Sequence, residues 1–89
     1  MSCYLITYDA QSFETRQALG DQIRALDGTC WNGVDNVWMI KSDETGLEIR
    51  KRLRSVIGQA DKIIVALLAG WAIWHGFDGD AEAWLTKHL

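Results

Sequence analysis

Two short segments, 3–8 and 62–68, most constrain the fold, because both alternating rows of side chains in each are largely apolar. Successive side chains of a strand point to opposite faces of a sheet, so strands of this composition need cover on both faces. The two rows of the later segment are Ile63, Val65 and Leu67, and Ile64, Ala66 and Leu68. We expect helices to cover one face, and either the C-terminal tail or a second copy of the molecule to cover the other.

A first helix is predicted to follow Ser12, a favourable N-cap, with Glu14 in its first turn. Apolar residues recur there at i, i+4 and i+7, and Gly20 lies off this stripe. The stripe consists of Leu19, Ile23 and Leu26. Asp27 and Gly28 are predicted to end the helix.

A second helix has the clearest local signature in the chain. Thr45 and Glu48 have the spacing of a capping box, in which each side chain satisfies a backbone donor near the other. The predicted buried stripe consists of Ile49, Leu53, Val56 and Ile57. Gly58 is predicted to stop the helix.

A β-hairpin is predicted between the helices, with strands at 29–34 and 37–41 joined by Asp35 and Asn36. Both turn residues tolerate positive φ, which tight hairpin turns require. In the tail, residues 71–77 have no clear period and form either a short strand or an irregular crossing. A last short helix is expected to begin near Asp80, with Trp84 and Leu85 as anchors.

The predicted order is strand, helix, strand, strand, helix, strand. This order predicts an α+β, ferredoxin-like βαββαβ sandwich, with a four-stranded antiparallel sheet and two helices on one face. Residues 1–89 would form this single domain, and 69–89 would be a C-terminal extension with a short helix. The second sheet face is too apolar for water, so a homodimer formed through the sheet face, the tail or both is expected.

Composition narrows the functional classes. The chain has 89 residues and a net charge of −3, which argues against avid, unselective binding to nucleic acid. Cys3 and Cys30 are its two cysteines, and they are expected to be reduced and buried. No signal peptide or membrane-spanning segment is predicted, so a cytoplasmic location without membrane partners is expected.

Asp9 ends the first predicted strand and is the main candidate for chemistry. A carboxylate beside a turn often only accepts hydrogen bonds from backbone N–H groups of the loop, which is a structural role. No glycine-rich phosphate loop, nucleophile elbow or cysteine–histidine catalytic spacing is present. His75 beside Trp74 is either a general acid or base, or a surface histidine, and His88 has no metal-ligand spacing to the cysteines.

Five of the nine basic residues are candidates for contacts with phosphates, or else form the solvated exterior of a helix. They are Arg50, Lys51, Arg52, Arg54 and Lys62. The five tryptophans are expected mainly in the core and at interfaces, with base stacking as the alternative for Trp31 or Trp74. Trp71, Trp74 and Phe77 are the predicted interface with a second subunit or a protein partner.

The chain resembles the small SinR-like bacterial and phage proteins. These are similar to the CRISPR-associated protein two superfamily, which includes the virulence-associated protein D toxins. The segments that carry the resemblance are Tyr-Leu-Ile-Thr-Tyr-Asp (4–9), Gly-Thr-Cys-Trp-Asn (28–32), Val-Trp-Met-Ile-Lys-Ser-Asp (37–43), Asp-Lys-Ile-Ile-Val (61–65), Trp-His-Gly-Phe (74–77) and Glu-Ala-Trp-Leu (82–85). They span nearly the whole chain, which has no helix-turn-helix pattern.

The resemblance implies a ferredoxin-like homodimer in which Asp9 from each subunit lies near the two-fold axis. Two such carboxylates would hold Mg²⁺, which would activate water against a phosphodiester bond. Many relatives have histidine where Asn32 stands, so any role of that histidine is absent here. Many superfamily members have lost nuclease activity and serve as structural or DNA-bridging units.

Two functions follow as hypotheses. The first is a non-enzymatic homodimeric binding module for nucleic acid or for a protein partner, such as a phage or defence component. The second is a divalent-metal-dependent endonuclease that cleaves RNA or DNA with Asp9 of both subunits at the metal. The first is favoured, because the chain has one candidate catalytic carboxylate, a net negative charge and more aromatic than basic surface.

Overall fold

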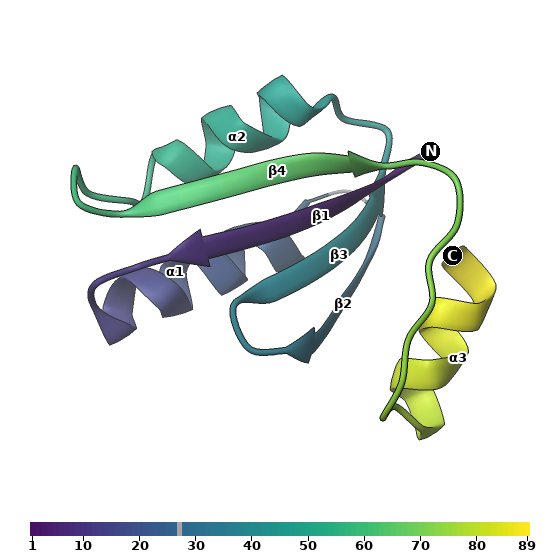
Figure 1. Ribbon diagram of the computed structural model, residues 1–89. Coiled ribbons are helices and arrows are strands. Elements are labelled where there is room, and N and C mark those ends of the chain that lie inside the picture. The colour runs from purple at the N-terminus through teal and green to yellow at the C-terminus, as the bar shows by residue number, and fades with distance from the viewer. Residues whose placement is uncertain (27) are drawn as a thin grey trace.

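The computed structural model describes residues 1–26 and 28–89, and has the predicted α+β, ferredoxin-like arrangement with an additional C-terminal helix (Figure 1). Asp27, predicted to help end the first helix, lies outside the described residues. The elements in chain order are β1 (Ser2–Asp9), α1 (Phe13–Arg24), β2 (Thr29–Val34), β3 (Val37–Ser42), α2 (Gly46–Arg54), β4 (Lys62–Leu68) and α3 (Gly79–His88).

The four strands form one sheet in the order β2-β3-β1-β4, and every neighbouring pair is antiparallel. β1 is central, as its two apolar rows predict. Leu5 lies between Met39 and Ala66, and Thr7 lies between Val37 and Ile64. This register places every second residue of β1, β3 and β4 on the same face of the sheet.

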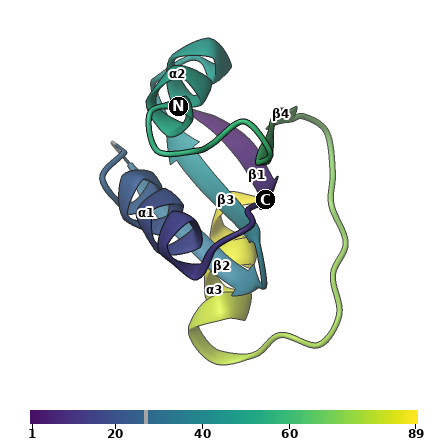
Figure 2. The same cartoon turned by 90° about the vertical axis from the view of Figure 1, so that its left-hand side faces the viewer.

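α1 and α2 cover one face of the sheet and enclose the main core (Figure 2). The sheet contributes the alternate row that begins at Tyr4, and the helices contribute the first residues of the predicted stripes. Leu26, Val56 and Ile57 also pack on this core, but from positions just beyond the two helices. Residues of this cluster with at most 2% exposure are Ile6, Leu19, Ile23, Ile40, Ile49 and Leu53. Each buried side chain of this size stabilises the fold by about 1.5–3 kcal/mol relative to an exposed one.

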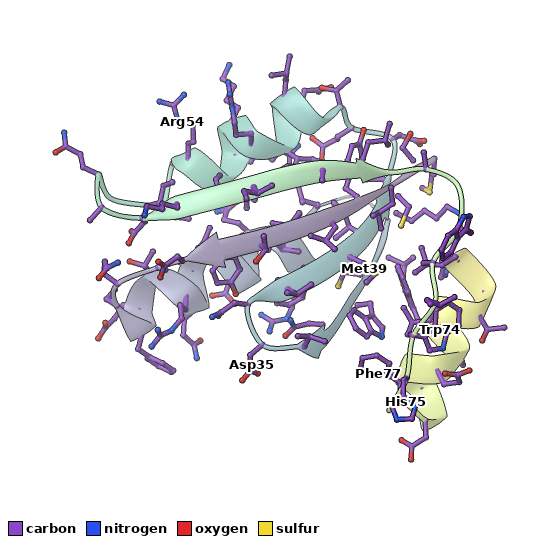
Figure 3. The ribbon with its side chains drawn as sticks, in the orientation of Figure 1. Asp35, Met39, Arg54, Trp74, His75 and Phe77 are labelled. Carbon is purple, nitrogen blue, oxygen red and sulfur yellow. The ribbon has the colours of Figure 1, made fainter. Side chains whose placement is uncertain are left out.

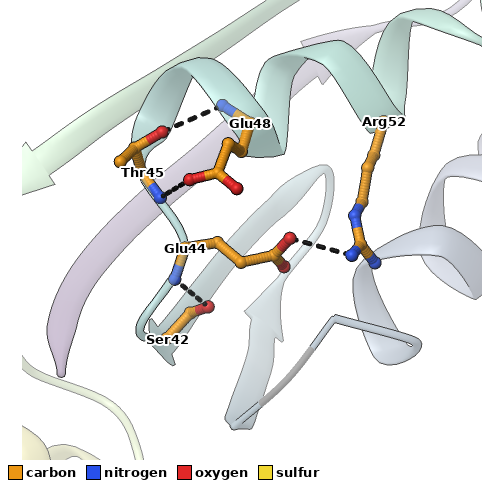
Figure 4. Close-up of polar contacts among 5 residues, drawn as sticks. All are labelled: Ser42, Glu44, Thr45, Glu48 and Arg52. Carbon is orange, nitrogen blue, oxygen red and sulfur yellow. Dashed lines mark hydrogen bonds and ion pairs between the residues drawn. The ribbon is translucent and has the colours of Figure 1, made fainter.

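Both predicted helix starts are confirmed. Ser12 caps α1, and its hydroxyl accepts a hydrogen bond from the Thr15 backbone N–H at 3.0 Å. Thr45 caps α2 in a complete capping box (Figure 4): Glu48 N–H donates to Thr45 Oγ1 at 3.2 Å, and Thr45 N–H donates to Glu48 Oε1 at 3.1 Å. These hydrogen bonds lower the pKa of the Glu48 carboxyl.

The predicted end of the second helix is wrong. α2 ends at Arg54, with Ser55 as its C-cap. Gly58 lies four residues beyond the last helical residue and does not stop the helix. The Gly58 backbone N–H instead donates to Asp61 Oδ2 at 2.8 Å, within the turn that leads into β4. The Asp61 side chain therefore holds the backbone at Gly58, and a helix C-cap pattern does not predict this contact.

Gly20 is also placed differently from its prediction. It is buried on the inner side of α1 next to Trp38, so it does not lie off the buried stripe. A Cβ at this position would lie 3.4 Å from both Arg24 Nη1 and Trp38 Cζ2. Gly28 has φ of +110°, and a Cβ there would lie 1.7 Å from the Lys41 carbonyl oxygen, so only glycine fits.

The tail is an irregular crossing rather than a strand. Residues 69–78 stand away from the sheet on the side opposite α1 and α2 (Figure 2), and α3 then packs beside β2. The N-cap of α3 is Asp78 and not Asp80, because Asp78 is the last residue with extended backbone before the helix. The predicted anchors hold: Leu85 is 1% exposed, and Trp84 Nε1 donates to Thr29 Oγ1 at 3.0 Å.

The tail and α3 cover only part of the second face. Phe77 packs edge-on against Trp31 with ring centroids 5.2 Å apart, and Leu85, Trp31 and Cys3 are buried outside the main core cluster. On the β4 side of the same face, Ile64 is 61% exposed. The sequence left open whether the tail or a second copy covers this face. The tail and α3 cover the β2 side, and the β4 side stays uncovered.

Candidate functional site

Asp9 lies at the exposed end of β1, and its direct partner across the antiparallel pair is Lys62 of β4. Both residues belong to the face that α1 and α2 leave open, the same row as Thr7 and Ile64. Within residues 1–26 and 28–89, no group of three or more histidine, cysteine or acidic side chains could hold a metal ion. The predicted Mg²⁺ site therefore needs the Asp9 carboxylate of a second subunit.

The structural role considered for Asp9 belongs to Asp61. Its two carboxylate oxygens accept hydrogen bonds from the backbone N–H groups of Gln11 at 2.9 Å and Gly58 at 2.8 Å. These bonds tie the β1–α1 loop to the turn before β4, and they lower the pKa of the Asp61 carboxyl. The sequence analysis missed Asp61, although aspartate and glycine close together are typical of turns.

Three of the predicted phosphate-binding residues lie together. Arg50, Lys51 and Arg54 line one shallow depression on the exposed side of α2, which also includes Leu47 and Ser55. Figure 3 shows the Arg54 side chain extending from the end of this helix. This arrangement suits contacts along a phosphate backbone rather than a closed pocket for a small ligand.

The other two basic candidates lie apart from that depression. Lys62 is on β4, opposite Asp9. Arg52 is on another side of α2 and forms an ion pair with Glu44 at 2.9 Å (Figure 4). Arg52 thus connects α2 to the segment that follows β3.

The three predicted interface residues have different surroundings, although all lie on the segment before α3 (Figure 3 labels two of them). Trp71 is 81% exposed. Trp74 is half-buried, and its Nε1 donates to Glu82 Oε2 at 2.6 Å. Phe77 packs within its own chain, against Trp31. Trp71 is consequently the member of this set whose ring is available to a partner.

The thiols and imidazoles differ in their surroundings too. Burial raises the pKa of the Cys3 thiol, although Lys41 nearby lowers it. Burial, Lys41 and Lys87 lower the pKa of His88, whose ring lies 4.5 Å from that of Trp84. His75 is exposed on the tail (Figure 3). A raised thiol pKa disfavours the thiolate, so Cys3 is a packing residue rather than a nucleophile.

A groove that the sequence analysis did not identify lies between α1 and the β2–β3 hairpin. Arg16, Gly20 and Arg24 are spaced four residues apart along α1 and line it together. The i, i+4, i+8 spacing of these three residues can be seen in the sequence. It indicates a site only when the structure shows that the hairpin lies opposite this side of α1.

Neither a family model nor a curated protein matches the sequence. Among solved structures, the chain is similar to the crystal structure of a hypothetical protein, TT1823, from Thermus thermophilus. The two share 22% sequence identity with a TM-score of 0.69, over 85% of this chain and 92% of that one. At this identity the likeness shows the fold alone. None of the described helices is long and apolar enough to cross a membrane.

Proposed function

We propose that this protein is a non-enzymatic binding module that works as a homodimer, with the open face of the sheet as the dimer interface. The observation that carries the proposal is the apolar row on the β1–β4 side of this face that the tail leaves uncovered: Ile64 is 61% exposed, and Leu5 and Ala66 are half-buried. Exposed apolar rows on a sheet face are typical of surfaces that bind another protein chain. A two-fold axis near β1 would also bring the two Asp9 carboxylates closer together.

The proposed ligand of the dimer is a nucleic acid, held by Arg50, Lys51 and Arg54 of α2. In a dimer formed through the open face, each subunit keeps its own set of these cations on the helix-covered side, away from the interface. A duplex DNA that contacts the three cations of one subunit should give a slope of about −2.7 in log K against log salt. A protein partner that contacts Trp71 is the other outcome of the binding experiments.

Dimer formation is tested by Ile64→Asp, with Leu67→Asp as the matched control. Both residues lie on β4 with similar exposure, 61% and 62%, but their side chains belong to opposite rows. Sedimentation equilibrium should give a dimer for the wild type and for Leu67→Asp, and a monomer for Ile64→Asp. At about 100 µM even a weak dimer should be populated. A wild type that is monomeric at this concentration would contradict the proposal.

Nucleic-acid binding is tested by fluorescence anisotropy with single-stranded RNA and duplex DNA at several salt concentrations. Arg54→Glu should weaken binding and reduce the salt slope. Lys87→Glu on α3 makes the same charge reversal outside the α2 depression and should change neither as much. Equal effects of the two substitutions would place the ligand elsewhere.

The endonuclease remains the second candidate, and one observation favours it. Because Asp61 holds the loop after β1, Asp9 is not needed for that structural role. If the dimer holds Mg²⁺ between two Asp9 carboxylates, cleavage of RNA or DNA should require Mg²⁺ and be lost in Asp9→Ala. Absence of cleavage at any Mg²⁺ concentration, with an intact dimer, leaves the binding module as the function.

A further inference from the structure

The groove between α1 and the β2–β3 hairpin has a volume of about 490 Å³, within the range of small-molecule sites. It lies on the helix-covered side of the sheet, and its lining includes neither Asp9 nor any residue of the α2 depression. Gly20 lacks a side chain on the inner face of α1, so Arg24 and Trp38 both lie close to the helix backbone there.

Two arginines give the groove its cationic wall, and they differ in how they are paired. Arg24 lies 5.1 Å from the centre of the Trp38 ring, and its Nη1 is 3.2 Å from Asp21 Oδ1. Arg16 Nη1 makes one long contact, 3.4 Å to the Ala10 carbonyl oxygen. Most of the guanidinium fork of Arg16 is therefore available for a phosphate or carboxylate, which it would bind with two parallel N–H donors.

Aromatic side chains supply flat surfaces in the same groove. Phe13 lines it from the first turn of α1 and is 63% exposed. Trp38 Nε1 donates to the Tyr8 hydroxyl oxygen at 3.2 Å, which leaves the hydroxyl hydrogen of Tyr8 to donate elsewhere. Exposed aromatic rings beside arginine are typical of sites where a nucleobase stacks.

The opposite wall carries an acceptor. Asp35 lines the groove from the tip of the hairpin (Figure 3). The hairpin end is held by Asn32, whose Nδ2 donates to the carbonyl oxygens of Val34 at 3.1 Å and Val37 at 2.6 Å. A carboxylate fixed opposite cations suits a ligand that presents hydroxyl donors at one end and an anion at the other, as the ribose and phosphate of a nucleotide do.

We propose that this groove binds a ribonucleotide. Its phosphate contacts Arg16, its base stacks on Phe13, and its ribose hydroxyls donate to Asp35. The ligand is either a free nucleoside monophosphate or one nucleotide of a single-stranded RNA, since the two share this chemistry. The proposal does not depend on the dimer or on the basic surface of α2.

Calorimetric titration of the full chain with the four ribonucleoside 5′-monophosphates, and with a short single-stranded oligoribonucleotide, tests the proposal. At least one of these ligands should bind with a dissociation constant below about 1 mM. Binding of a monophosphate identifies the free nucleotide, and binding of the oligonucleotide alone identifies a strand. Ribose 5-phosphate should bind more weakly than the nucleotide, because it lacks the base.

Arg16→Ala should weaken binding of the tightest ligand by about tenfold or more, as expected for the loss of a charged hydrogen-bond donor. Lys87→Ala, which removes the same charge from exposed α3, is the control and should leave affinity unchanged. Phe13→Ala should weaken binding by about tenfold through lost stacking, and Ile73→Ala, at an 84% exposed tail residue, should not. Arg16 and Phe13 are exposed, so these variants are expected to fold.

Three results would overturn the proposal. The first is that no ribonucleotide binds. The second is that Arg16→Ala binds as well as Lys87→Ala does. The third is that ribose 5-phosphate or inorganic phosphate binds as tightly as the nucleotide, which would leave an anion site without base recognition.

Discussion

The two faces of the sheet are built from the same alternating strands, yet they are covered in different ways. On one face, α1 and α2 enclose a cluster in which Ile6, Leu19 and Leu53 have 0% exposure. On the other, one short helix covers the β2 side, and Ile64 stays 61% exposed. An alternating apolar pattern therefore shows that a strand face needs cover, but it does not identify the covering element.

The largest predicted effect concerns the helix-covered face. Leu53→Ala removes a fully buried side chain from α2 and should lower the free energy of unfolding by about 3–5 kcal/mol, measured by chemical denaturation. Because this face holds the main core, the whole domain should lose stability in one transition. A loss no larger than that caused by Leu85→Ala, on the other face, would show that the two faces contribute alike.

A smaller, more local effect is expected on the other face. Leu85→Ala should cost about 2–3 kcal/mol, since α3 has fewer neighbours that lose contacts. Hydrogen exchange should accelerate in residues 79–88 and much less in β1 and β3. Equal acceleration throughout the chain would mean that α3 is an integral part of the main core.

The start of α2 gives a third test. Thr45→Ala removes one half of the capping box and should destabilise the domain by about 1 kcal/mol, measured by thermal or chemical unfolding. Ser12→Ala removes the corresponding cap of α1 and is the natural comparison. Similar losses from both would show that the two helices contribute alike to covering this face.

The smallest predicted effect is a pH dependence of the α3 side alone. Burial and the cations Lys41 and Lys87 hold the pKa of His88 below its ordinary value of 6.5, so the folded state favours the neutral ring. Docking of α3 should therefore be strongest above that value and weaken as the pH falls through it. Hydrogen exchange of residues 79–88 between about pH 7.5 and 5 measures this, and His88→Gln should abolish the change.

Most of the fold follows from local sequence patterns. Side chains in the strands alternate between the two faces of the sheet, and the N-caps of α1 and α2 are hydrogen bonds between residues three positions apart. The errors involve contacts that a helix pattern does not describe. Gly58 lies in a turn beyond α2, where its N–H binds Asp61, and Asp61 also binds Gln11, 50 positions away. Gly20 departs from its predicted place because Trp38 of another element fills the space beside it.

The candidate sites were less predictable than the fold for the same reason. The grouping of Arg50 and Arg54 follows from their spacing on one helix. The groove at Arg16 depends on the hairpin that faces it, and the sequence does not indicate which residues of the two elements meet. The comparison with solved structures adds only the fold, so the proposed ligands rest on the side-chain chemistry described above.

The hydrogen bond from Trp84 to Thr29 joins residues 55 positions apart and has a consequence for synthesis on the ribosome. The βαββαβ unit is complete once residue 68 has emerged, whereas α3 comes last. Until then the nascent chain lacks Phe77, the tail residue that packs on Trp31, so this apolar ring of β2 stays uncovered while the rest of the sheet can already form.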